Sequence, residues 1–213
     1  MNTKTYACLT HSCLLISIFL CGCSGLTRQY HATSEGMSLD YVVQKEQEIV
    51  LKQPINVTLH DDRSNKDFIG DGAKSTVGDK FLGYFAFGVL YATAPDSPTL
   101  KNKEDPATVF KTAIIKRLNN VGVSTLDDVS TKIVLDITVK RFELDFSFGI
   151  WISEAAYTAS FKKDGQVFCR KEIAEKSKHF NLYGYGSGEE TANDAFNKSI
   201  NALDLKECLS RVS

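Results

Sequence analysis

The feature that most constrains the fold is a long alternation of apolar and polar side chains at positions 131–148. Apolar residues at every second position predict a β-strand. The parity changes once, at Lys140-Arg141, between two apolar sets: Ile133, Leu135, Ile137 and Val139, then Phe142, Leu144, Phe146 and Phe148. A β-bulge or sharp bend at the change would keep both sets pointed inward. The alternative is a strand that is buried on both faces at one end.

Other strands are predicted on both sides of this one. Alternating apolar residues at 55–59 indicate a strand, and Pro54 places its start at a sheet edge or a bulge. Residues 151–180 predict a hairpin, because Asp164-Gly165 is typical of a two-residue type I′ turn.

Two helices are predicted. Asp105 at the cap position and Pro106 in the first turn begin the first helix, which Gly122 ends. Ser187, with Glu190 three residues later, predicts a capping box for the last helix. Each helix has an apolar stripe: Phe110, Ile114, Leu118 and Val121 in the first, and Ala192, Phe196, Ile200 and Leu203 in the last.

This order of elements predicts one α+β domain over residues 48–213. The economical arrangement is a mainly antiparallel β-sheet with two helices packed on one face. Hydrophobic residues make up 43% of the 213-residue chain, which is enough for one sizeable core.

An apolar insertion at 81–94, FLGYFAFGVLYATA, has no clear helical or strand period and is too short to span a membrane as a helix. Two interpretations stay open. The segment either folds over the sheet as core, or it covers a pocket, meets a partner or touches lipid. The residues that would make that contact are Phe81, Tyr84, Phe85, Phe87, Leu90 and Tyr91.

Residues 1–22 have the pattern of an export signal, since Lys4 precedes a short apolar run. The following Leu20-Cys21-Gly22-Cys23 resembles the bacterial lipobox. That resemblance implies cleavage before Cys23, diacylglycerol on its thiol and an acyl chain on the new amino terminus, with no other cofactor. By the same resemblance to bacterial lipoproteins, Ser24 in place of an aspartate implies sorting to the outer membrane over retention in the inner membrane. An uncleaved anchor and ordinary cleavage that leaves Cys23 unmodified are the alternatives.

Residues 23–47 are mostly polar and predict a lipidated flexible tether between the lipid and the domain. Two cysteines follow far along the chain, Cys169 and Cys208. Because the periplasm is oxidising, the two cysteines could form a disulfide. The alternative is two buried thiols.

Catalytic and nucleic-acid functions find little support. The formal net charge is −1 and no basic stripe is present, which excludes a typical nucleic-acid binder. The GDGAKST stretch at 70–76 lacks the glycine that precedes lysine in a nucleotide-binding loop. The histidines are too far apart in sequence to indicate a metal site. Glu143 and Asp145 alternate with aromatic residues, which is typical of a solvent-facing side of a strand. We therefore expect no enzyme.

Three features behind the lipobox resemble the YajG-type family of bacterial lipoproteins. Asp61, Arg63 and Ile69-Gly70 resemble the family's D-x-R … I-G stretch. Asp105-Pro106, Leu118 and Gly122 resemble its D-P … L … G helix, and a long β-region closed by a C-terminal helix follows. A looser likeness is to auxiliary lipoproteins of lipopolysaccharide assembly and of ABC transport. The apolar segment 81–94 departs from the family pattern.

These resemblances imply a non-enzymatic accessory protein on the periplasmic face of the outer membrane, anchored through lipidated Cys23. We expect it to act as a binding or scaffolding protein with an envelope protein or lipopolysaccharide as its partner, and without nucleotide or nucleic acid. The alternative is a carrier or assembly factor for lipid or lipopolysaccharide that uses the 81–94 loop.

Overall fold

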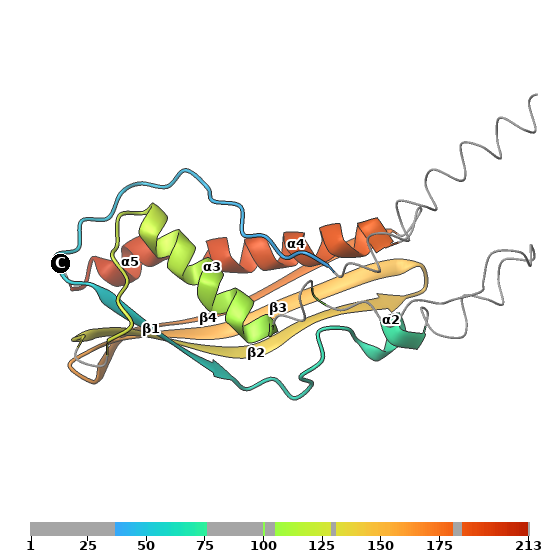
Figure 1. Cartoon of the computed structure of the whole chain (residues 1–213), viewed down its shortest axis with the longest axis horizontal. Helices are drawn as coiled ribbons and strands as arrows, with labels where there is room; N and C mark the ends of the chain where they lie inside the picture. The colour runs from blue at the N-terminus through green and yellow to red at the C-terminus, as the bar shows by residue number, and fades with distance from the viewer. Residues whose placement is uncertain (1–36, 76–99, 101–104, 129–130, 181–184, 213) are drawn as a thin grey trace, which may run out of the picture.

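The structure is a computed structural model that describes residues 37–75, 100, 105–128, 131–180 and 185–212. Its centre is a four-stranded sheet in the order β1-β2-β3-β4 (Figure 1). The strands are β1 (Ile55–Asp61), β2 (Ile133–Ser147), β3 (Ile150–Lys163) and β4 (Gln166–Phe180). The described helices are α2 (Asp71–Ser75), α3 (Pro106–Asn120), α4 (Tyr185–Ala202) and α5 (Leu205–Leu209).

The sheet is mixed: the expected antiparallel pairing holds for three strands, and the fourth departs from it. β2, β3 and β4 form two antiparallel pairs, but β1 runs parallel to β2, with Ile55 opposite Ile133. The reason lies in the connection, because α3 stands between β1 and β2 along the chain. A strand–helix–strand crossover brings the second strand back in the direction of the first. β1 is an edge strand, as Pro54 indicates.

The change of parity in β2 is a β-bulge, which confirms the first of the two interpretations. Opposite β3 the register shifts between Val139 and Arg141. Val139 and Phe142 are therefore both buried although their positions differ in parity. The second set ends earlier than predicted, because Phe148 lies in the turn after β2 and is 99% exposed.

Aromatic rings join the two long helices to the sheet. Phe110 of α3 meets Phe142 of β2 edge to face, with ring centroids 4.7 Å apart, and Phe196 of α4 lies 5.2 Å from Phe110. Tyr157 of β3 donates a hydrogen bond to the carbonyl of Ser199 on α4, and burial raises the pKa of its phenol. Side chains from α3 and α4 thus share one core with β2 and β3.

The ends of α3 follow the sequence closely. Asp105 is the N-cap and accepts the backbone N–H of Thr108, Pro106 is the first residue, and Gly122 takes a φ of +84° just after the end. The start of α4 differs from prediction. The helix begins at Tyr185, so Ser187 lies inside its first turn and not at the cap. The predicted apolar stripe of α4 is fully buried.

A disulfide joins Cys169 of β4 to Cys208 of α5, with Cα atoms 5.5 Å apart. Both residues are buried. The short helix α5, which Asp204 caps through the N–H of Glu207, is thereby attached covalently to the sheet.

We predict that replacing both cysteines, Cys169→Ala with Cys208→Ala, lowers the free energy of unfolding by about 3–4 kcal/mol, because the disulfide closes a loop of 39 residues. Urea unfolding measures the change, and reduction of the unaltered protein is the matched control. Two thiols that react with an alkylating agent in the unreduced, denatured protein would contradict the disulfide.

Candidate functional site

The candidate site is a docked segment together with the helix that receives it. Residues 37–49, called the strap here, run beside α3 and α4 before the chain enters β1 (Figure 1). Met37 and Tyr41 are buried, at 3% and 4% exposure. The part of the predicted tether that the structure describes, residues 37–47, is therefore packed on the domain.

Three asparagines hold the strap on the α4 side. Asn193, Asn197 and Asn201 stand four residues apart, so they share one face of the helix. The carboxamide of Asn193 accepts the N–H of Asp40 at 2.9 Å and donates to the carbonyl of Ser38 at 2.8 Å.

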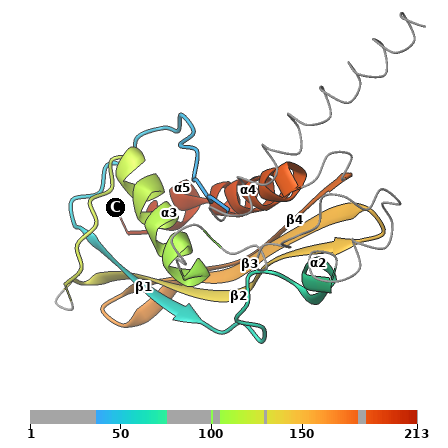
Figure 2. The same ribbon diagram turned by 45° about the vertical axis from the view of Figure 1, so that its right-hand side comes forward.

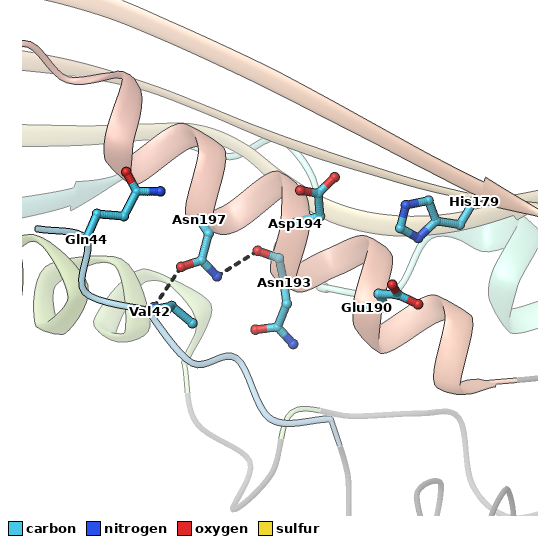
Figure 3. Close-up of a pocket in the computed structure, with 7 residues that line it drawn as sticks. All are labelled: Val42, Gln44, His179, Glu190, Asn193, Asp194 and Asn197. Atoms are coloured by element: carbon cyan, nitrogen blue, oxygen red, sulfur yellow. Dashed lines mark hydrogen bonds between the residues drawn. The ribbon is translucent and has the colours of Figure 1, made fainter.

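The carboxamide of Asn197 repeats this pattern one step further along the strap. It accepts the N–H of Val42 at 2.7 Å (Figure 3). It also donates to the carbonyl of Asp40 at 3.0 Å. A carboxamide offers an acceptor and donors as a peptide group does. Asn193 and Asn197 thus pair with the backbone of the strap as a neighbouring β-strand would.

The spacing of the asparagines explains why the pairing repeats. Four residues of an α-helix rise by about 6 Å, and two residues of an extended chain rise by about 6.6 Å. Every fourth helical residue therefore meets every second strap residue. The third asparagine, Asn201, accepts the hydroxyl of Tyr41 at 2.9 Å. Because Asn193 and Asn197 bind only backbone groups of the strap, these pairs do not depend on which side chains the strap carries.

On the other side, α3 binds the strap through basic and amide groups. Lys116 donates to the carbonyl of Tyr41 at 2.8 Å, and Asn120 donates to the carbonyl of Gln44 at 2.9 Å. The N–H of Ile49 donates to the carbonyl of Val121.

Arg117 binds the strap and both helices at once. Its side chain is buried, and it contacts both carboxylate oxygens of Glu46 at 2.8 and 2.7 Å. The remaining nitrogen donates to the carbonyls of Ile200 and Leu203 at the end of α4. Ile200 lies in the last turn of α4, where carbonyls lack partners inside the helix, and Leu203 follows the helix directly. A cation there is favoured by the helix dipole.

A polar pocket of about 480 Å³ lies between the strap, α4 and β4 (Figure 3). Its lining residues are Val42, Gln44, His179, Glu190, Asn193, Asp194 and Asn197. Burial opposes ionisation of Asp194, but hydrogen bonds from Lys198 and Ser177 outweigh it and lower the pKa of this carboxyl. Asp194 is thus an ionised, partnered side chain and not a general acid. The pocket suits hydrogen bonding with a polar ligand.

Other carboxylates of the described sheet are also paired with cations. Glu154 lies between Arg141 and Lys176, and the hydrogen bonds from Lys176 and Arg141 lower the pKa of its carboxyl. Glu143 lies 3.8 Å from Arg141. Within the described residues, no three histidine, cysteine, aspartate or glutamate side chains gather as a metal site would require.

The glycine-rich stretch at 70–76, as far as it is described, packs against a carboxylate. Asp145 accepts the N–H of Ala73 at 2.8 Å, so an acidic side chain stands where a nucleotide-binding loop would hold phosphate. A Cβ atom at Gly70 would lie 2.7 Å from the carboxyl carbon of Asp145, and one at Gly72 would lie 2.4 Å from the carbonyl of Phe146. These glycines allow α2 to approach β2 near the turn that joins β2 to β3 (Figure 2).

The residues that resemble the YajG-type motifs have structural roles. Asp61 holds Arg63 through two hydrogen bonds of 2.9 Å, and Arg63 is 4% exposed. Ile69 pairs with Leu144, and the N–H of Gly70 donates to the same residue. The motif therefore attaches the segment after β1 to β2, and it places no reactive group in a cleft.

Of the other predicted site residues, two lie in the described part of the chain and the rest lie outside it. Cys169 and Cys208 meet in the disulfide. Cys23 and the apolar segment 81–94, with Phe81, Tyr84, Phe85, Phe87, Leu90 and Tyr91, lie outside the described residues. The strap and the asparagine row were not predicted. The row could have been detected in the sequence. Asparagine is a poor helix former, so three asparagines spaced four residues apart on one face of a helix are unusual.

No protein-family model and no curated protein matches the chain. Solved structures resemble it distantly. A Xanthomonas campestris protein of the DUF330 family is 12% identical, with a TM-score of 0.49 over 78% of this chain and 90% of that chain. PelC from Paraburkholderia phytofirmans, a dodecamer, is 8% identical, with a TM-score of 0.38 over 74% and 92%. Lipoprotein GNA1162 from Neisseria meningitidis is 12% identical, with a TM-score of 0.27 over 70% and 99%. The function is therefore argued below from the residues of this chain.

We predict that Asn197→Ala releases the middle of the strap. It removes the two hydrogen bonds from this side chain to the strap, worth about 1 kcal/mol each, so the amide of Val42 should exchange with solvent at least about tenfold faster. Hydrogen exchange measures the rate. Glu190→Ala, on the same helix, is the control and should leave that rate unchanged. An unchanged rate in the Asn197 variant would show that the asparagine row does not hold the strap.

We predict that Asp61→Asn destabilises the domain by about 1–2 kcal/mol at neutral pH. The hydrogen bonds from Arg63 lower the pKa of Asp61 from 3.8 to about 2. A lowered folded pKa adds stability above pH 4 that is lost as the pH falls toward 2. The difference in free energy of unfolding between the unaltered protein and the variant, measured in urea, should therefore become smaller as the pH falls from about 4 to about 2. Asp62→Asn, at the exposed neighbouring position, should have a smaller effect, and a gap independent of pH would contradict the assignment.

Proposed function

We propose that this chain is a cell-envelope lipoprotein without catalytic activity, anchored through lipidated Cys23, that acts as a binding or scaffolding protein. The proposed location is the periplasmic face of the outer membrane, and the proposed partner is an envelope protein or lipopolysaccharide. The lipobox-like Leu20-Cys21-Gly22-Cys23 carries the proposal. None of the helices in the described part of the chain has the length and apolarity to cross a membrane.

The strap supports this proposal because it fits a role in anchorage. It continues the segment that follows Cys23 and is bound from both sides by α3 and α4. Contacts of this extent are unnecessary for a spacer whose only task is to link lipid to domain. They make sense where the anchor must hold the domain in a defined position.

The character of the described polar groups supports a binding role over a catalytic one. The pocket beside α4 presents three carboxamides, the partnered carboxylate of Asp194, Glu190 and His179. Among its described lining residues none is a serine, cysteine or lysine. Its polar walls suit a hydrogen-bonding partner better than an acyl chain.

The experiment is the intact mass of the protein extracted from bacterial membranes, compared with a Cys23→Ser variant. We expect a mature chain that begins at Cys23 and carries acyl mass, and we expect the variant to lack that mass. A chain that keeps residues 1–22, or one that is cut without acyl mass, would overturn the proposed anchorage.

A further inference from the structure

The turn between β2 and β3 presents a side chain that the fold does not require. Phe148 and Gly149 form this turn with φ angles of +50° and +76°. Two positive φ angles are typical of a type I′ turn, which prefers Asn-Gly or Asp-Gly. A phenylalanine there is disfavoured by roughly 1 kcal/mol or more, because its Cβ crowds the backbone. The side chain of Phe148 is also 99% exposed.

The turn at the opposite end of the same sheet has the residue types that this backbone conformation normally carries. The turn between β3 and β4 is formed by Asp164 and Gly165, with φ angles of +49° and +82°. The backbone conformation is nearly the same, but the exposed residue is polar. The geometry of the hairpin therefore does not explain Phe148, which combines a strained backbone with a fully exposed aromatic ring.

A second exposed phenylalanine lies at the same end. Phe180, the last residue of β4, is 72% exposed and pairs with Ile150, two residues after Phe148. Lys178 is exposed two residues before it. This end of the sheet, called the hairpin end here, thus presents two aromatic rings with a cation beside them.

The strap also begins at the hairpin end. The N–H of Ser38 donates to Glu189 in the first turns of α4. A Cβ atom at the neighbouring Gly188 would lie 3.1 Å from the ring of Trp151, so α4 starts on top of this tryptophan. Trp151 follows the turn at Phe148-Gly149 by two residues. The described part of the strap therefore begins at the end of the sheet that carries the exposed phenylalanines.

The length of the intervening chain limits how far this end can lie from the lipid. Cys23 precedes Met37 by 14 residues, which span at most about 50 Å even when fully extended. β2 alone has 15 residues and is about 50 Å long. The opposite end, where the disulfide lies, is within reach of Cys23 only if these 14 residues are almost fully extended along the sheet. An anchor on Cys23 thus favours the hairpin end as the side that meets the membrane.

We propose that the hairpin end docks on the lipid bilayer, with Phe148 and Phe180 inserted at the level of the headgroups. Phenylalanine side chains of surface-bound segments are buried at the boundary between headgroups and acyl chains, and a basic residue such as Lys178 is attracted to anionic lipid. The inference rests on the proposed anchorage through Cys23. A bilayer suits a small convex tip with few ordered partners, whereas a protein interface requires a broad complementary surface.

The test uses Phe148→Trp in the acylated protein, reconstituted into phosphatidylethanolamine–phosphatidylglycerol vesicles in which part of the lipid carries brominated acyl chains. Trp151, the only natural tryptophan, is 2% exposed and supplies a constant background. We expect brominated lipid to quench most of the emission that the new tryptophan adds. Val167→Trp, at the 54% exposed position near the opposite end, is the matched control and should stay unquenched.

Equal and weak quenching at positions 148 and 167 would overturn the inference. A new emission that is already blue-shifted without vesicles would also overturn it, because protein and not lipid would then cover this end. The acyl mass of the same preparation tests the anchor separately. If Cys23 proves unmodified, the proposed function fails, and vesicles added to the unacylated Phe148→Trp protein still decide whether this end binds lipid. In that format, Phe148→Ser should weaken vesicle binding at least about fivefold.

Discussion

The buried guanidinium of Arg117 is the group on which the strap and both long helices depend. It lies on α3, pairs with Glu46 of the strap and donates to the last carbonyls of α4. A buried charge without a partner costs several kcal/mol, so the packing of α3 against the end of α4 requires Glu46 to be in place. The strap is therefore part of the domain, because it supplies the carboxylate that the interface between the helices needs.

The elements that could be predicted are those that local chemistry determines. Asp105, Pro106 and Gly122 define the ends of α3, and the parity change at Lys140-Arg141 locates the bulge of β2. The direction of β1 was missed, since an alternating pattern is the same in parallel and antiparallel strands. The crossover through α3 carried that information. Phe148 was placed inside the sheet because alternation does not mark the last paired residue of a strand.

The candidate site was harder to predict than the fold. Residues 37–47 are polar, which is typical of a linker, and their docking uses backbone groups that leave no pattern in their own sequence. The receiving helix did carry a pattern in Asn193, Asn197 and Asn201, but it is informative only once an extended segment is known to lie beside it. The Asp61–Arg63 motif shows the reverse case, since a conspicuous charged sequence proves to be an internal ion pair.

The direction in which the strap runs determines how a pull on it would load these hydrogen bonds. The strap runs from the hairpin end along α4, since Ser38 meets Glu189, Asp40 meets Asn193 and Val42 meets Asn197 in that order. In the proposed arrangement, with the anchor at the hairpin end, a pull on the strap acts along this row, so its hydrogen bonds are loaded together in shear and not one after another. The row continues to Glu46 and Arg117, and the far end of the sheet is joined to α5 by the Cys169–Cys208 disulfide. In that arrangement the strap passes a pull to α4 and α3, which bind it directly, and not to the turn that carries Phe148.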